Sequence, residues 1–204
     1  MKKKKVLGMC LAMGIMASVI GGSLAWFTDT DTVTNQFTTG SDGEVGPDGK
    51  QGLAIVEDFD QTAADRMIPG TNVKKEVQVE NRANYSQYVR VKLKKVWKDK
   101  QGLEITDVNG TPLRDEYIEM TLVNLGDGAD QWKEHDGYYY YTSPLAESDG
   151  LGNGGADTSK MLLEKVKLSD QAGNEYKDIK FDVVVEAESV QAENNAADDV
   201  WGPF

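Results

Sequence analysis

The sequence predicts an all-β protein, a single jelly-roll-like antiparallel β-sandwich that follows an N-terminal signal-peptide helix. Several runs alternate apolar and polar residues with the period of two that is typical of half-buried strands. Turn signals such as Asn109-Gly110 and Asp136-Gly137 separate these runs. No long stretch has a helical period, and 204 residues with 39% hydrophobic residues suffice for one sizeable core.

The N-terminus has the three parts of a secretory signal. Lys2 to Lys5 form a positive segment, residues 6–20 are apolar, and Ser23 and Ala25 are small residues at the −3 and −1 positions. We expect cleavage between Ala25 and Trp26 and therefore a secreted, extracellular or cell-surface protein. An uncleaved membrane anchor is the alternative, since residues 6–27 would just reach the length of a spanning helix. It ranks second, because Gly21-Gly22 and the small residues that follow suit access by a peptidase better than a place in the hydrocarbon.

The predicted strands alternate most clearly near the middle and the end of the chain. Val89, Val91 and Leu93 alternate with basic residues, and Phe181, Val183 and Val185 form a second apolar face. In a third run Lys75 interrupts the apolar face. The full set of expected strands is residues 30–38, 53–56, 73–81, 88–97, 118–123, 138–142, 161–168 and 179–187.

The chain divides into four parts on this interpretation. Residues 1–25 are the signal peptide, 26–40 a mature N-terminal strand, 41–191 the sandwich domain and 192–204 an acidic C-terminal tail. Two polar stretches rich in Gly and Asp, 41–52 and 147–159, are expected to be loops. The tail ends with Trp201, which either stays in the tail or packs back onto the domain.

The charge argues against nucleic acid as a partner. Loss of the four signal lysines would take the net charge from −12 to −16. Nucleic acids and anionic membranes both attract basic surfaces. Cys10 lies in the apolar signal run, so the remaining chain has no thiol for a disulfide, a metal site or a nucleophile.

The sequence contains few residues of the types that enzymes use for catalysis. His135 is the single histidine, and a catalytic zinc site takes two or three imidazoles or their equivalents. We therefore expect no enzyme, no catalytic residue and no cofactor. Calcium is kept as an alternative, because Asp29 and Asp31 share a strand face and the glycine-rich stretch from Asp149 to Asp157 offers carboxylates.

Four consecutive tyrosines, Tyr138 to Tyr141, are the most unusual local feature. On a strand, one pair faces the core and the other faces away. Tyr139 and Tyr141 with the nearby Trp132 are candidates for an exposed aromatic shelf that binds a glycan or a protein. Ordinary sheet packing is the commoner role of such residues.

The stretch "GGSLAWFTDTDTVTNQFTTG" places a strand at a chain end that cleavage would release. Such a strand pairs with its own sheet or completes the sheet of the next molecule. Head-to-tail addition need not close and then makes fibres. Trp26, Phe27, Val33 and Phe37 are the apolar anchors expected to set its register.

The same stretch closely resembles the start of the TasA/camelysin family, whose members are exported by a SipW-type signal peptidase. The segments "IPGTNVKKEVQVEN", "DGYYYY" and "EAESVQAEN", with Trp201-Gly202 near the end, resemble the branch of BsaA-type biofilm matrix proteins. The resemblance spans nearly the whole chain.

This resemblance implies a jelly-roll subunit of extracellular biofilm fibres that grow by donor-strand exchange of the mature N-terminus. The partners would be further copies of the chain, with other matrix proteins or glycans as additional candidates. The family name camelysin also carries a metallopeptidase label, for which this sequence offers no zinc site. A monomeric surface module that binds through Tyr138 to Tyr141 is the alternative function.

Overall fold

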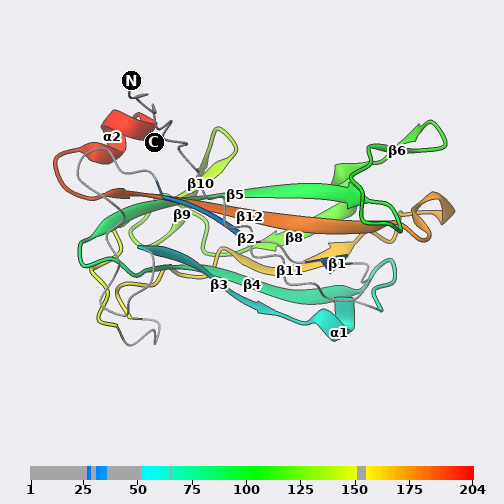
Figure 1. Cartoon of the computed structure of the whole chain (residues 1–204), viewed down its shortest axis with the longest axis horizontal. Coiled ribbons are helices and arrows are strands. Elements are labelled where there is room, and N and C mark those ends of the chain that lie inside the picture. The colour runs from blue at the N-terminus through cyan, green and yellow to red at the C-terminus, as the bar shows by residue number, and fades with distance from the viewer. Residues whose placement is uncertain (1–26, 29–30, 36–51, 65, 151–154) are drawn as a thin grey trace, which may run out of the picture.

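The computed structural model describes residues 27–28, 31–35, 52–64, 66–150 and 155–204. Strands dominate them, in two facing sheets, as the all-β prediction required. Figure 1 shows the two sheets one above the other, with their strands running along the long axis of the molecule. The predictions for the signal peptide and for Ala25 and Trp26 lie outside the described residues.

Sheet I, as we name it, contains β1 (Phe27–Thr28), β2 (Asp31–Asn35), β5 (Gln87–Lys98), β9 (Trp132–His135), β10 (Tyr138–Tyr141) and β12 (Lys180–Gln191). Its order is β1-β12-β5-β10-β9, with β2 also paired to β12. The pairings among β12, β5, β10 and β9 are antiparallel, whereas β1 and β2 run parallel to β12.

Sheet II contains β3 (Leu53–Phe59), β4 (Asn72–Asn81), β11 (Leu163–Leu168) and β8 (Ile118–Leu122), in the order β3-β4-β11-β8. All its pairings are antiparallel. A small hairpin of β6 (Asp107–Val108) and β7 (Thr111–Pro112) projects from the domain (Figure 1). Short helices complete the set: α1 (Gln61–Ala64), η1 (Asp115–Tyr117), η2 (Asn174–Tyr176) and α2 (Ala196–Trp201).

The core lies between the two sheets and is built from the predicted apolar faces. Val89 and Val91 of β5 and Val183 and Val185 of β12 are fully buried, and they meet buried residues of β4 and β11. Burying one such side chain stabilises the fold by roughly 1.5–3 kcal/mol. The alternation of the sequence therefore corresponds to real faces of the sheets.

Lys75 interrupts the apolar face of β4 and is nevertheless 0% exposed. Its Nζ donates to both carboxylate oxygens of Glu57 on β3, each at 3.1 Å, and it lies 5.1 Å from the ring centroid of Phe59. A buried ammonium is tolerated when it is paired in this way. The paired β3 strand thus explains the exception in the pattern.

Candidate functional site

The edge of β12 that faces away from β5 carries the N-terminal strand. Phe27 pairs in register with Phe181, and residues 31–35 pair with residues 185–189. Val33 is thereby placed opposite Ala187. Trp26 and Phe37, the other two predicted anchors, lie outside the described residues, as does Asp29.

The N-terminal strand lies where the two sheets approach each other. β2 contacts both β12 of sheet I and β3 of sheet II. A segment in this position closes one side of the sandwich, and its backbone groups complete the hydrogen bonding of β12. The strand predicted from the sequence is therefore present, and it pairs here within its own chain.

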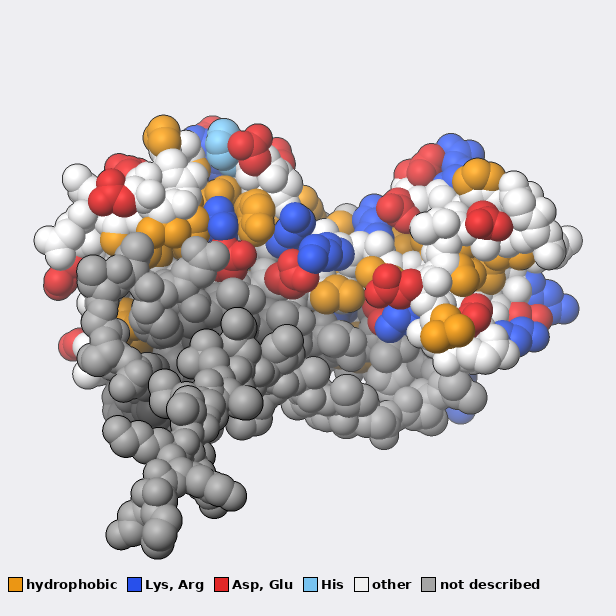
Figure 2. Space-filling view, turned by 45° about the horizontal axis from the view of Figure 1, so that its top comes forward, with side chains coloured by type: hydrophobic (Ala, Val, Ile, Leu, Met, Phe, Trp, Pro, Cys, Tyr) orange, Lys and Arg blue, Asp and Glu red, His pale blue; other side chains and the backbone are white. Residues whose placement is uncertain are grey.

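The opposite edge of β12 is paired with β5 over twelve residues, from Lys180 opposite Lys98 to Gln191 opposite Gln87. Ion pairs on the outer face reinforce this pairing. Arg90 Nε donates to Glu188 at 2.8 Å, Lys94 pairs with Glu186, and Lys98 pairs with Asp182. Figure 2 shows basic and acidic side chains next to one another across the middle of the molecule.

The four tyrosines of β10 alternate between the two faces, but the exposed shelf is not formed by the residues we expected. Trp132 is 0% and Tyr141 4% exposed, and their ring centroids lie 5.0 Å apart in the core. Tyr139 also packs against the core. β9 pairs with β10 so that Trp132 lies opposite Tyr141, which puts both on the inner face.

The backbone of Lys160 bonds to the polar atoms of two of these inner rings. Trp132 Nε1 donates to the carbonyl of Lys160 at 2.8 Å, and the Tyr141 hydroxyl accepts from Lys160 N–H at 3.1 Å. Burial raises the pKa of Tyr139 and of Tyr141, because a phenolate loses hydration in the interior. Trp132 and Tyr141 are thus structural residues of the core.

On the outer face, Tyr138 and Tyr140 surround Arg90. The guanidinium carbon of Arg90 lies 4.1 Å from the ring centroid of Tyr138, and Arg90 Nη1 donates to the Tyr140 hydroxyl at 3.0 Å. Such contacts between a cation and aromatic rings are favourable. Much of the outward tyrosine surface is therefore occupied from within the chain.

The C-terminal segment covers this aromatic cluster. α2 lies over the outer face of sheet I (Figure 1), and Trp201 lies 4.8 Å from the Arg90 guanidinium. Phe204 stacks on Tyr140 with a centroid distance of 4.3 Å. Of the two roles left open for Trp201, packing onto the domain is the one observed. These contacts join residues that are far apart in the sequence. The one sequence feature that could have suggested them is the presence of two aromatic residues, Trp201 and Phe204, near the end of the chain.

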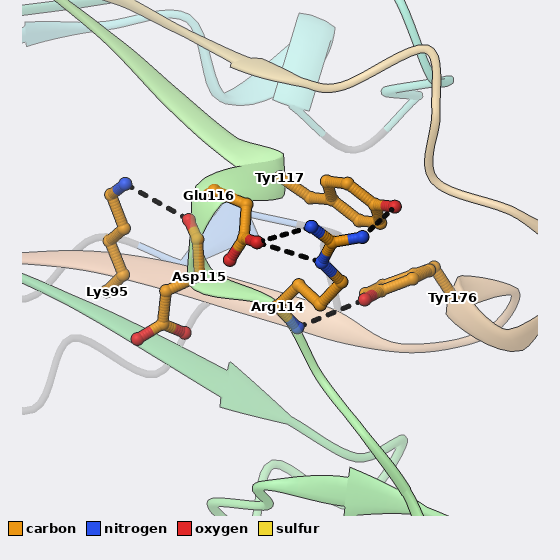
Figure 3. Close-up of polar contacts among 6 residues, drawn as sticks. All are labelled: Lys95, Arg114, Asp115, Glu116, Tyr117 and Tyr176. Carbon is orange, nitrogen blue, oxygen red and sulfur yellow. Dashed lines mark hydrogen bonds and ion pairs between the residues drawn. The ribbon is translucent and has the colours of Figure 1, made fainter.

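A cluster of polar residues joins the two sheets near η1 (Figure 3). Lys95 Nζ donates to the carbonyl of Asp115 at 3.0 Å, and Arg114 donates twice to one oxygen of Glu116. The pKa of Glu116 is lowered, first by its own backbone N–H and then by Arg114. Arg114 N–H donates to the hydroxyl of Tyr176, whose pKa is raised chiefly by burial.

An open cleft of about 680 Å³ adjoins this cluster and is lined by residues that include Lys95, Trp97, Glu104, Ile105, Leu113 and Asp115. Trp97 Nε1 donates to Asp115 Oδ1 at 3.0 Å. These polar groups hold the ends of two sheets together, and their partners belong to the chain itself. The cluster is best described as a structural junction.

His135 lies on the exposed hairpin between β9 and β10, where Asp136 and Gly137 both have positive φ values, 50° and 77°. Its Nε2 is 3.6 Å from an Asp136 oxygen. No group of three or more His, Cys, Asp and Glu side chains within the described residues is arranged to hold a metal ion. No helix in that part of the chain is long and apolar enough to cross a membrane.

Comparison with known proteins adds no assignment: no family model, no curated protein and no solved structure matches the chain.

Proposed function

We propose that this protein is a secreted structural subunit of extracellular biofilm matrix fibres and that it assembles by donating its N-terminal strand to the next copy. The observation that carries the proposal is the placement of β1 and β2. They form the end of the predicted mature chain and pair with β12 along one edge only. Exchange of this strand between copies keeps the same pairing and links the molecules.

The proposal includes a jelly-roll-like arrangement of the sandwich. Consecutive strands repeatedly cross between the layers, because β4, β8 and β11 of sheet II are followed by β5, β9 and β12 of sheet I. Such crossings between two antiparallel sheets are typical of jelly-roll sandwiches. The function we propose is not enzymatic, and a SipW-type peptidase and further copies of the chain are the partners.

The alternative, a monomeric binding module, has less support. It needs an open aromatic surface on β10, whereas the rings of Tyr138 and Tyr140 contact Arg90, Trp201 and Phe204. Glycans or other matrix proteins as ligands of that surface would have to compete with these contacts.

A peptide experiment tests strand donation directly. A fluorescent peptide of residues 26–38 is added to the chain that begins at Thr39, and fluorescence anisotropy is recorded. We expect saturable binding, and weaker binding when Val33 of the peptide is replaced by proline, which lacks the N–H. Absence of binding to a folded acceptor would argue against the proposed function.

A further inference from the structure

The C-terminal segment, residues 193–204, covers a tyrosine on the outer face of sheet I. Tyr140 lies on that face beside Arg90, yet only 2% of it is exposed. The ring of Phe204 stacks on it, and the ring of Trp201 meets it edge-on with centroids 5.8 Å apart. Figure 1 shows α2 and the chain end over this part of the sheet. The burial of this outward tyrosine therefore depends on the C-terminal segment.

The surface under the C-terminal segment is both aromatic and cationic. We call it the tyrosine surface, and it consists of Tyr88, Arg90, Tyr138 and Tyr140. The guanidinium of Arg90 contacts the ring of Tyr138 on the sheet and the ring of Trp201 on the C-terminal segment. Tyr88 meets the second ring of that segment at 6.4 Å between centroids. Rings on both sides of a cation suit a ligand that brings aromatic side chains.

The C-terminal segment is attached to the domain by side-chain packing. Directly before it, Ala192 N–H donates to the carbonyl of Ser86 at 2.9 Å. Among the described residues, the backbone hydrogen bonds of the segment itself stay within it, as from Asp199 N–H to the carbonyl of Asn195 at 3.1 Å. Its release would thus break ring contacts and leave the pairing of the strands intact.

Two features weaken the attachment within one chain. Trp201 Nε1 is buried, and within the described part of the chain it has no hydrogen-bond acceptor, which is costly for a donor. Asn194 and Asn195, which connect β12 to α2, have φ values of 58° and 57°. This left-handed conformation is unfavourable for residues other than glycine. A strained connection favours exchange of the segment that follows it between copies.

We propose that the tyrosine surface is a peptide-binding site, which the C-terminal segment fills in its own chain and the same segment of a second copy can fill instead. The ligand is recognised by two aromatic side chains three positions apart, those of Trp201 and Phe204. Exchange keeps every ring contact and relieves the strained connection, so the two arrangements are close in free energy. The site lies on β5 and β10 and does not rest on strand donation at β12.

Peptide binding to the chain from Trp26 onward, which contains all described residues, tests the proposal. A fluorescent peptide of residues 192–204 is titrated with the parent chain and with two full-length variants, and anisotropy is recorded. The double variant Trp201→Ala, Phe204→Ala removes the two rings that compete from within the chain. We expect saturable binding to it and at least about tenfold weaker binding to the parent, whose tethered segment competes at a millimolar effective concentration.

The second variant, Asn194→Pro, keeps both rings. Proline cannot adopt the φ of 58° found at this position, so the connection that seats the segment in its own chain is lost. We expect this variant also to bind the peptide more tightly than the parent does. It decides the test if circular dichroism shows that the double variant does not fold.

A matched peptide controls for charge. The peptide with Trp201→Ala has the same net charge and is expected to bind the variants at least about tenfold more weakly, because it lacks the ring that contacts Arg90. The proposal is overturned by equal binding of the parent and the variants, by no saturable binding to a folded variant, or by equal binding of the two peptides.

Discussion

The two edges of β12 are held in different ways. On one edge, β5 pairs with it over twelve residues and adds the ion pairs of Arg90, Lys94 and Lys98. On the other edge, two short runs of two and five residues pair with it in parallel. β5 therefore holds β12 through a much longer paired edge than the N-terminal strand does. In the proposed function, β5 is the permanent partner of β12 and the N-terminal strand is the one exchanged between copies.

Breaking the permanent edge should have the largest effect. Val91 is fully buried and lies opposite Ala187. Val91→Asp would place a carboxylate in the core, and we expect a loss of more than about 4 kcal/mol in the free energy of unfolding. Urea unfolding followed by circular dichroism measures it. A variant that unfolds like the parent would contradict the role assigned to β5.

Breaking the exchangeable edge should abolish assembly and spare the fold. Val33→Pro removes one backbone N–H from β2 and interrupts its pairing with β12. We expect a folded protein by circular dichroism that does not form fibres, whereas Val33→Ile retains both properties. Fibres from the proline variant would show that β2 is not the donor.

The ion pairs between β5 and β12 differ in how far they are buried. Arg90 is largely buried and bonds to both Glu188 and Tyr140, whereas Lys94 is exposed beside Glu186. Arg90→Ala should cost about 2 kcal/mol and Lys94→Ala less than about 0.5 kcal/mol in unfolding free energy. Equal losses in urea titrations would mean that the aromatic surroundings of Arg90 add nothing.

Substitution of Tyr139 should have the smallest effect on the free energy of unfolding, and the effect should be visible only at alkaline pH. Its pKa is raised by burial and by Glu134, so its contribution to stability is complete below the unfolded value of about 10 and is lost as the pH rises through the folded value. Tyr139→Phe should match the parent at pH 7 and keep more of its stability at pH 11. Equal alkaline losses in the two proteins would contradict this.

The alternation of apolar and polar residues predicted the strands well. The positions of side chains that depend on contacts between distant parts of the chain were not predicted. Every strand expected within the described residues is present, because alternation reports directly on which face is buried. β9 has only four residues, too few to show its period, so Trp132 was assigned to a surface although its pairing with β10 turns it inward. The contacts of Trp201 and Phe204 with Tyr140 depend on how the chain end returns to the sheet, which no local pattern encodes.

Negative-stain microscopy of two purified proteins tests the central claim most directly. One begins at Trp26 and the other at Thr39, and circular dichroism confirms that each is folded. Strand donation predicts filaments from the first protein and none from the second. Filaments from both, or monodisperse particles from both across a range of salt and pH, would contradict the account.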